Sequence, residues 1–357
     1  MKHPNPRTIE DVQARVRETA AVIPCGGRTK PALLAPDGAA CVDMTGLRDV
    51  VDYEPSEFTI TVQAGLPLAD LARLLGSNGQ YLPFDPPLVE AGATIGGTVA
   101  AGLSGPGALG GGGLRDFVIG VGYIDGAGRL IRGGGRVVKN AAGFDLPKLM
   151  VGSLGRLGVL VEVSLKVFPR PRHDSTVSIE CGGLAEAVEM LHRIAGSNLQ
   201  ADALDLEPPG RLFVRLSGNR EALPRRMERL VEICGLPAEP MVGAATEAYW
   251  KSVCEFAWAP PQCLLVKVPL TAGEIVRLDH ALEPVGTPRR YSIAGNVAYL
   301  AWPGERGAEE VEQLLQAQDL CGLVLHGEAA GPQLNPRPGL GPRLKNAMDP
   351  AGRFAEL

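Results

Sequence analysis

A glycine-dense stretch between Gly92 and Gly158 constrains this chain more than any other feature. It holds 21 of the 46 glycines among the 357 residues, and the overall glycine content of about 13% exceeds the usual level of about 7%. Apolar runs such as residues 117–121 are interleaved with these glycines, which a flexible linker does not require. We therefore expect an ordered backbone that approaches a bound ligand closely.

Composition excludes several classes of partner and site. The formal net charge is −5 and the sequence pI is about 5.7, so no basic field is present to hold nucleic acid or an anionic membrane surface. The cysteines form no C-x-x-C pair and no close cluster, so we expect neither a metal site nor an iron–sulfur centre in this chain. The seven are Cys25, Cys41, Cys181, Cys234, Cys254, Cys263 and Cys321.

The sequence predicts a cytoplasmic chain with no direct membrane span. It contains no run of about 18 uninterrupted apolar residues, and its N-terminal residues lack the apolar core of a signal peptide. An odd number of cysteines suits a reducing compartment. Association with the inner face of the cell membrane through a partner is compatible with these features.

The order of expected elements predicts an α+β fold. A helix is expected over residues 8–20, and a hairpin over residues 117–134 turns at Gly126–Gly128. Beyond the Pro169/Pro171 pair glycine thins, and strands and helices alternate twice, which predicts a helix-backed antiparallel sheet. We place a first domain at residues 1–172, a cap or partner-binding domain at 173–330, and a C-terminal helix that returns to the first domain at 331–357.

The segment PCGGRTK, Pro24 to Lys30, follows an expected strand and exposes successive backbone N–H groups, as a pyrophosphate site does. Glycine lets the backbone reach an anion, Thr29 can donate a hydroxyl, and Lys30 or Arg28 adds charge. The segment is neither G-x-G-x-x-G nor G-x-x-x-x-G-K-[ST], so a Rossmann or P-loop nucleotide site is not supported. An ordinary tight loop is the alternative.

Two further small-residue segments could lie against a planar ligand. ATIGGT, Ala93 to Thr98, leads into an expected helix start rich in glycine and alanine, and GSLGRLG, Gly152 to Gly158, would bring its backbone against the same ligand. Their alternatives are a close helix–sheet contact for the first segment and a plain turn for the second.

In this order and spacing, the segments resemble the FAD-binding domain of the p-cresol methylhydroxylase/vanillyl-alcohol oxidase type, the PCMH type. More narrowly, GGRTK, LPFDPP, ATIGGTVAAGLSGP, LRDFVIG and GGRVVKNAAGFDLPKLMVGSLGRLGVLVEVSLKVFPRP are similar to the FAD-binding E subunits of bacterial glycolate oxidases. The resemblance covers roughly residues 8–172 and is faint beyond them.

This resemblance implies two α/β subdomains that clasp FAD, followed by an α+β cap. Relatives with covalent flavin carry a histidine after the glycine pair of the first loop, whereas this chain has Arg28, so non-covalent FAD is expected. The chain departs from the family pattern at Gly110–Gly113 and in its ending DPAGRFAEL. The implied cofactor-binding residues are Pro24, Cys25, Gly26, Gly27, Arg28, Thr29, Lys30, Pro83, Asp85, Pro86, Ala93, Thr94, Ile95, Gly96, Gly97, Ala100, Gly102, Ser104, Gly105, Arg115, Asp116, Gly155, Gly158, Val159 and Val161.

Oxidation of a 2-hydroxy acid needs a base for the hydroxyl proton and a cation for the carboxylate, beside the flavin. His326 follows a short expected strand and is the best base candidate. The other four histidines, His3, His173, His192 and His280, show no pairing suited to a metal. The arginine pairs Arg225–Arg226 and Arg289–Arg290 are more typical of solvated faces.

The sequence therefore predicts a non-covalent FAD-binding subunit of a multi-subunit glycolate, or D-2-hydroxy acid, dehydrogenase. Because the chain lacks cysteine clusters, electrons would leave through a separate iron–sulfur subunit. A homologous FAD-containing subunit could carry the oxidation itself. Two alternatives stay open: a self-sufficient FAD-dependent oxidase or dehydrogenase of another hydroxy acid, and a non-catalytic assembly subunit that keeps the flavin fold.

Overall fold

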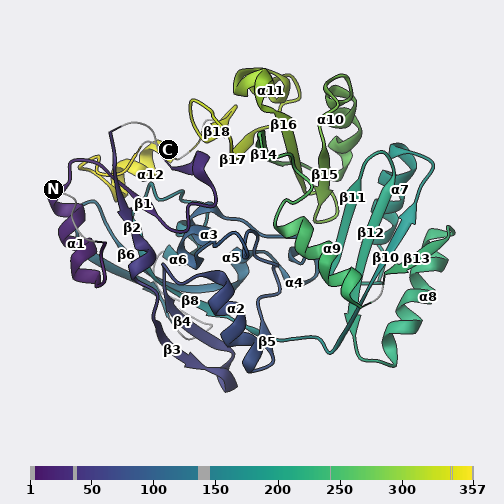
Figure 1. Ribbon diagram of the computed structural model, residues 1–357, viewed down its shortest axis with the longest axis horizontal. Helices are drawn as coiled ribbons and strands as arrows, with labels where there is room; N and C mark the ends of the chain where they lie inside the picture. The colour runs from purple at the N-terminus through teal and green to yellow at the C-terminus, as the bar shows by residue number, and fades with distance from the viewer. Residues whose placement is uncertain are drawn as a thin grey trace.

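The computed structural model describes residues 5–34, 38–135, 145–241, 243–337, 339 and 341–355 (Figure 1). The chain begins with helix α1 (Ile9–Glu18), whose start is fixed by a capping box. The Thr8 hydroxyl accepts the Asp11 N–H at 3.1 Å, and the Asp11 carboxylate accepts the Thr8 N–H at 3.0 Å. Strands β1 (Val22–Cys25) and β2 (Ala40–Asp43) then form a parallel pair.

A five-stranded antiparallel sheet forms the centre of the N-terminal half. In spatial order its strands are β3 (Val50–Glu54), β4 (Thr59–Gln63), β8 (Val159–Lys166), β6 (Val118–Ile124) and β7 (Leu130–Gly134). The expected hairpin is present as β6–β7, because the Asp125 carboxylate accepts the N–H groups of Ala127 and Arg129 in its turn.

Short helices and a second small strand pair surround this sheet. They include α2 (Leu68–Ser77), α3 (Ile95–Ala101), α4 (Ala108–Gly111), α5 (Leu114–Phe117) and α6 (Leu146–Met150), with β5 (Gln80–Tyr81) paired to β9 (Phe168–Pro169). Strand β8 ends at Lys166, before the short strand β9. Part of the KNAAGFD segment, residues 139–144, lies outside the described residues.

The second half is a nine-stranded sheet in which every recorded strand pair is antiparallel. Its spatial order is β13-β10-β12-β11-β15-β16-β14-β17-β18. The strands are β10 (His173–Glu180), β11 (Ala203–Glu207), β12 (Arg211–Gly218), β13 (Ala238–Met241), β14 (Cys263–Pro269), β15 (Arg289–Ser292), β16 (Val297–Pro303), β17 (Gly322–His326) and β18 (Gln333–Leu334).

This sheet is built from two copies of one β-α-β-β-α-β unit. The first unit runs from β10 to β13 with helices α7 (Leu184–Ala195) and α8 (Ala222–Cys234), and the second runs from β14 to β17 with α10 (Ile275–Leu282) and α11 (Gly307–Ala317). The two units meet edge to edge where β11 pairs with β15. The expected twofold alternation and helix-backed antiparallel sheet are confirmed.

The two faces of the nine-stranded sheet have different neighbours. On β14, Leu264, Val266 and Val268 pack in the same apolar cluster as the helices, whereas Leu265 packs in the cluster of the N-terminal half. This alternation is the period of two expected of a strand buried on both faces. Helix α9 (Ala244–Cys254) covers the far end of the same face as Leu265, opposite helices α7, α8, α10 and α11. There the Trp250 indole donates to the Thr176 hydroxyl at 2.7 Å.

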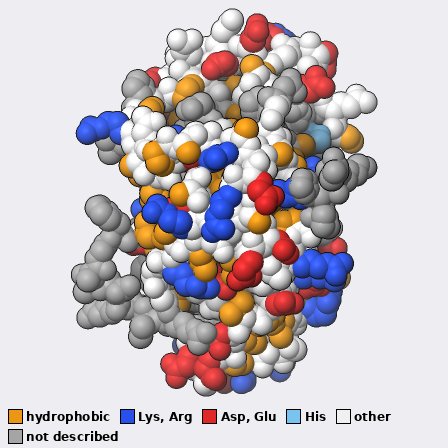
Figure 2. Space-filling model, turned by 90° about the vertical axis from the view of Figure 1, so that its left-hand side faces the viewer, with side chains coloured by type: hydrophobic (Ala, Val, Ile, Leu, Met, Phe, Trp, Pro, Cys, Tyr) orange, Lys and Arg blue, Asp and Glu red, His pale blue; other side chains and the backbone are white. Residues whose placement is uncertain are grey.

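The chain returns to its beginning at the C-terminus. After helix α12 (Gly341–Met348), Phe354 forms a parallel bridge with Val22, and the Val22 N–H donates to the Arg353 carbonyl at 2.7 Å (Figure 1). The face that carries both termini shows basic, acidic and apolar side chains interspersed (Figure 2). The expected boundaries near residues 172 and 330 stay predictions.

None of the helices in the described ranges combines the length and apolar character that a bilayer span requires.

Candidate cofactor site

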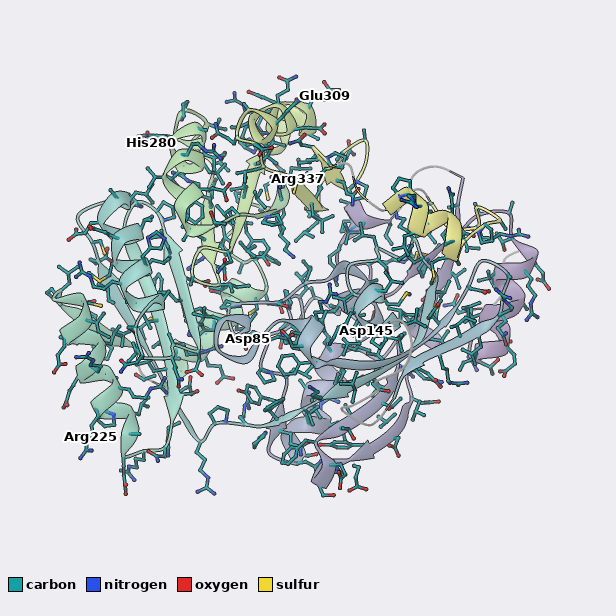
Figure 3. The ribbon with its side chains drawn as sticks, turned by 180° about the vertical axis from the view of Figure 1, so that it is seen from behind. Asp85, Asp145, Arg225, His280, Glu309 and Arg337 are labelled. Atoms are coloured by element: carbon teal, nitrogen blue, oxygen red, sulfur yellow. A yellow bond between two sulfur atoms is a disulfide. The ribbon has the colours of Figure 1, made fainter. Side chains whose placement is uncertain are left out.

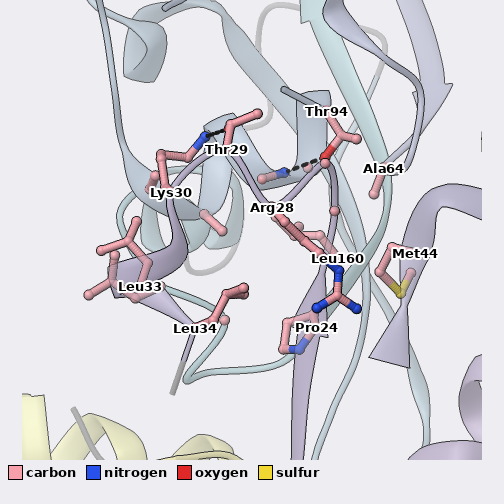
Figure 4. A pocket seen from close by; sticks show the side chains of 18 of the residues that line it. Pro24, Arg28, Thr29, Lys30, Leu33, Leu34, Met44, Ala64, Thr94 and Leu160 are labelled. Atoms are coloured by element: carbon pink, nitrogen blue, oxygen red, sulfur yellow. Dashed lines mark hydrogen bonds between the residues drawn. The ribbon is translucent and has the colours of Figure 1, made fainter. Parts of the chain in front are cut away.

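A pocket lies where three glycine-containing segments of the N-terminal half converge (Figure 4). Its empty volume is about 710 Å³, which includes space open to solvent. The lining residues are Pro24, Gly26, Gly27, Arg28, Thr29, Lys30, Leu33, Leu34, Met44, Ala64, Thr94, Gly96, Gly97, Ala100, Ala101, Leu154, Gly155, Gly158 and Leu160.

The first segment follows β1 and is pressed against the second. A Cβ atom on Gly27 would fall on the carbonyl oxygen of Gly92, and one on Gly26 would fall on the hydroxyl of Thr94. No side chain fits at either position without moving backbone or a buried residue. The glycine pair therefore permits this close approach of the two loops.

The second segment is the start of α3. The buried Thr94 side chain accepts the Gly97 N–H at 3.3 Å and so caps the helix. Gly96 lies so close to Ala64 that an added Cβ would stand 2.6 Å from the Ala64 methyl carbon. The result is a surface of small residues on the pocket wall, which suits a planar ring.

The third segment joins the second through backbone hydrogen bonds. The Leu154 N–H donates to the Ala100 carbonyl at 2.8 Å, and the Gly152 N–H donates to the Val99 carbonyl at 3.0 Å. Leu154 and Gly155 adopt positive φ angles of 53° and 72°, and Gly155 packs against the ring of Pro24. The turn thus closes the wall opposite the first loop.

The charge lining the pocket is positive. Among the described residues that line it, the charged ones are Arg28 and Lys30. Lys30 is 8% exposed, its ammonium donates to the Thr29 hydroxyl at 3.1 Å, and burial lowers its pKa to about 8. A buried cation with no acidic side chain among the described lining residues fits an anionic ligand such as the pyrophosphate of FAD.

A disulfide lies directly behind the first loop. It joins Cys25, the last residue of β1, to Cys41 on β2, with the Cα atoms 6.0 Å apart. The Arg28 guanidinium donates to the Cys41 sulfur at 3.0 Å. The expectation of scattered cysteines missed this pair, because parallel pairing of β1 with β2 brings the two together and their sequence spacing does not show it.

About half of the predicted cofactor residues line the pocket. They are Pro24, Gly26, Gly27, Arg28, Thr29, Lys30, Thr94, Gly96, Gly97, Ala100, Gly155 and Gly158. The following predicted residues do not line it: Cys25, Pro83, Asp85, Pro86, Ala93, Ile95, Gly102, Ser104, Gly105, Arg115, Asp116, Val159 and Val161. Val159 and Val161 pack in an apolar cluster with α1 instead, and the Asp116 carboxylate caps α5 by accepting the Gly113 N–H.

Sequence reasoning missed the apolar part of the wall. It consists of Leu33, Leu34, Met44, Ala64, Ala101, Leu154 and Leu160. Leu154 and Leu160 lie within or beside the glycine turn, and Ala101 lies in the predicted helix, so their segments gave a signal. Nothing in the local sequence marks Met44 or Ala64, because tertiary packing brings them to the pocket.

Two predicted loops lie at the junction between the pocket domain and the nine-stranded sheet. Asp85, from LPFDPP, accepts the Gly107 N–H at 2.8 Å and forms an ion pair with Arg215 of β12 at 2.5 Å (Figure 3). Tyr299 of β16 donates to the Ser104 carbonyl at 3.3 Å, and Lys267 of β14 donates to the Gly102 carbonyl at 3.3 Å. The cap thus holds these loops directly.

No described histidine lines the pocket. His173, His192, His280 and His326 are exposed, and His280 lies on the outer helix α10 (Figure 3). His326 ends β17, where its Nε2 lies 3.3 Å from the Pro261 carbonyl oxygen. His3 lies outside the described residues. Within the described ranges no group of His, Cys, Asp and Glu could hold a metal.

Comparison with known families supports what the pocket indicates. Residues 5–134 match the family described as FAD binding domain, and this range includes the first loop and α3. The chain contains an FAD-binding domain. The predicted cofactor, FAD, is thereby confirmed, and the glycine contacts and buried Lys30 fit it. Non-covalent attachment stays a prediction based on Arg28.

The FAD-binding domain is similar to a glycolate oxidase subunit. Over 164 residues the chain is 44% identical to glycolate oxidase subunit GlcE of Escherichia coli, which is 46% of this chain and 47% of that protein. Glycolate oxidase subunit GlcD of Bacillus subtilis is 26% identical over 328 residues, which cover 82% of this chain and 68% of that protein. The resemblance seen in the motifs is confirmed, although the match to GlcE spans only about half of its length.

A solved structure shares the whole fold. Alkyldihydroxyacetonephosphate synthase superposes with a TM-score of 0.73, covering 97% of this chain and 75% of that chain, at 16% sequence identity. At this identity the similarity shows the fold alone. It confirms the predicted α+β class, with an FAD-binding domain followed by an antiparallel sheet.

Proposed function

We propose that this chain is the non-covalent FAD-binding subunit of a multi-subunit dehydrogenase for glycolate or a similar D-2-hydroxy acid. It accepts or relays electrons, while a homologous FAD-containing subunit carries the oxidation and an iron–sulfur subunit takes the electrons onward. The matches to subunits named GlcE and GlcD support the assignment to such a complex. The proposed domains are those expected from the sequence: residues 1–172 bind FAD, residues 173–330 form the cap, and residues 331–357 form a C-terminal segment that packs back on the first domain.

The observation that carries the relay role is the way the cap meets the FAD-binding domain. Leu265, Tyr299 and Leu325 of the cap sheet share one apolar cluster with Phe84 and Leu103 of the FAD-binding domain. None of the described histidines lines the pocket, and His326, at the end of β17, is exposed to solvent with its Nε2 beside the Pro261 carbonyl. A packed junction without a base suits a subunit that holds a flavin better than one that oxidises a substrate.

The residues of this chain have defined tasks in the proposed role. The Gly26–Gly27 turn brings backbone N–H groups to the pyrophosphate, Lys30 and Arg28 supply positive charge, and the small residues of α3 admit the ring. FAD, when bound, supplies a two-electron acceptor that can pass electrons on. The cap contacts at Gly102 and Ser104 hold the loops beside the pocket.

The proposal places the chain in the cytoplasm, with the complex held at the inner face of the membrane through a partner. In this proposal the iron–sulfur centre belongs to a partner, since the described residues contain no cysteine cluster that could hold one.

The strongest alternative is a non-catalytic assembly subunit, which the exposed histidines also favour. A self-sufficient oxidase of another hydroxy acid would require His326 to reach the flavin, and its exposed position at the end of β17 does not favour this.

Anaerobic reduction of bound FAD separates these roles. The isolated, FAD-loaded chain is mixed with glycolate or D-lactate, and the same substrates are then added to the assembled complex. We expect the flavin of the isolated chain to stay oxidised and that of the complex to bleach. Bleaching of the isolated chain would show self-sufficient catalysis. A flavin of this chain that stays oxidised within a turning-over complex would favour the assembly role.

A further inference from the structure

Lys30 is buried in the pocket wall, and no ion pair joins it to a carboxylate in the described part of the chain. Its side chain is 8% exposed, and within the described chain its ammonium makes one side-chain hydrogen bond, to Thr29. Burial of an ammonium group costs free energy unless an anion or several acceptors replace water. The site is therefore incomplete with respect to charge.

The charged groups on the neighbouring segments do not pair with Lys30 in the described residues. Arg28 on the same loop donates to the Cys41 sulfur, Arg156 on the third segment is a cation, and exposed His326 ends β17, the strand that contacts the turn after Lys30. The carboxylate on the β1–β2 pair is Asp43, whose side chain accepts the N–H and hydroxyl of Thr45. Burial alone lowers the pKa of Lys30, to about 8.

We propose that Lys30 makes FAD binding proton-linked: its ammonium form receives the anionic phosphates of the cofactor, so the pocket takes up a proton as FAD enters at alkaline pH. This inference rests on the binding of FAD in this pocket. It adds a property of the site, namely that cofactor loading depends on pH through one lysine.

The direction of the pH dependence follows from linkage. Well below pH 8, Lys30 is already protonated in the free protein, so FAD binding takes up little of a proton. Above pH 8, Lys30 of the free protein is increasingly neutral, whereas in the complex the negative charge of the phosphates keeps Lys30 protonated. The Kd for FAD is therefore expected to rise about tenfold between pH 7 and pH 9.

The same linkage sets the stability of the cofactor-free protein. The folded pKa of Lys30 lies below the unfolded value, so the unfolded state binds more protons. The free protein is thus less stable at pH 7 than it would be with a neutral group at this position. Lys30→Met should raise the Tm of the free protein at pH 7 while it weakens FAD binding, which a merely structural lysine would not do.

The experiment is a titration of the refolded or deflavinated chain with FAD by calorimetry, at pH 7 to 9.5, in two buffers of different ionisation enthalpy. The wild type should take up between about half a proton and one proton per FAD at pH 9. Lys30→Arg keeps its charge at all these values and should bind FAD without that uptake. Any titration of the cofactor itself persists in this variant and can be subtracted.

The matched control is Arg28→Gln, which removes the other cation that lines the pocket. It should weaken binding by the same factor at every pH and keep the proton uptake. Equal uptake in wild type and Lys30→Arg, or a pH-independent Kd in the wild type, would overturn the proposal while FAD binding stands. A wild type that binds no FAD would overturn the cofactor assignment itself.

Discussion

At the scale of single residues, the glycines of the pocket differ sharply in what they tolerate. Gly27→Ala should abolish FAD retention and destabilise the protein by about 1–3 kcal/mol, because its Cβ would fall on the Gly92 carbonyl oxygen. Gly76→Ala is the control, since nothing lies within 4 Å of its added Cβ in helix α2, and it should stabilise by about 0.5–1 kcal/mol. Thermal melts and flavin absorbance after gel filtration measure both effects.

A buried carboxyl in the cap should respond to pH. Asp205 is fully buried on β11, one of its oxygens has no partner in the described structure, and burial raises its pKa to about 6. The folded pKa exceeds the unfolded value, so its contribution to stability is full below about pH 4 and is lost as pH rises through 6. Asp205→Asn keeps an acceptor for Ser292.

We therefore expect Asp205→Asn to gain stability relative to wild type as pH rises from 4 to 6, by about 2 kcal/mol. Urea denaturation at pH 4, 5, 6 and 7 measures the difference. A difference that does not vary with pH would contradict the raised pKa.

The pocket residues that the sequence predicted are those in glycine-rich segments. The PCGGRTK and ATIGG segments and the Gly155–Gly158 turn line the pocket, because a backbone that must approach a ligand leaves glycines in the sequence. Val159 and Val161, which the resemblance implied, do not line the pocket here, because strand alternation sends both to the opposite face, against α1.

At the scale of elements, one ion pair joins β12 to the loop before the glycine-dense segment. Arg215 and Asp85 have side chains that are 16% and 19% exposed, and the guanidinium lies over the Trp250 ring, 5.1 Å from its centroid. Arg215→Met leaves a largely buried carboxylate, so we expect a loss of about 2–3 kcal/mol. The loss should be smaller in the Arg215→Met/Asp85→Asn double variant.

The matched control for this pair is Arg229→Gln, which breaks an exposed pair with Glu232 on α8. It should change stability by less than about 0.5 kcal/mol. Chemical denaturation compares the variants, and equal effects of Arg215→Met and Arg229→Gln would show that the β12 contact does not hold the loop.

The Cys25–Cys41 disulfide between β1 and β2 leads to a prediction about the number of reactive thiols. Five of the seven cysteines are free, so the denatured, unreduced chain should react with five equivalents of a thiol reagent and the reduced chain with seven. Seven equivalents before reduction would mean that Cys25 and Cys41 are not linked in the purified protein.

Elements of the cap were predictable from periodicity, whereas their contacts were not. Helix α7 buries Ala187, Leu191 and Ile194 on one face, and that spacing is visible in the sequence. The partners of Arg215, Lys267 and Tyr299 lie more than 100 residues away, and no local pattern encodes them.

At the scale of the whole molecule, an FAD-binding domain and a twofold cap form one packed body. The apolar cluster that joins them includes Phe256 and Tyr299, whose rings meet edge-on with centroids 4.9 Å apart. Such packing favours a fixed cap over one that opens to admit substrate. This packing agrees with the proposed function, in which the chain holds FAD and a partner oxidises the substrate.

The most direct test of this account is the flavin content of the purified chain before and after acid precipitation. We predict one FAD per chain, released entirely into the supernatant and lost in the Gly27→Ala variant. A flavin that stays in the pellet would contradict non-covalent binding, and a colourless protein that cannot be reconstituted with FAD would contradict the cofactor site as a whole.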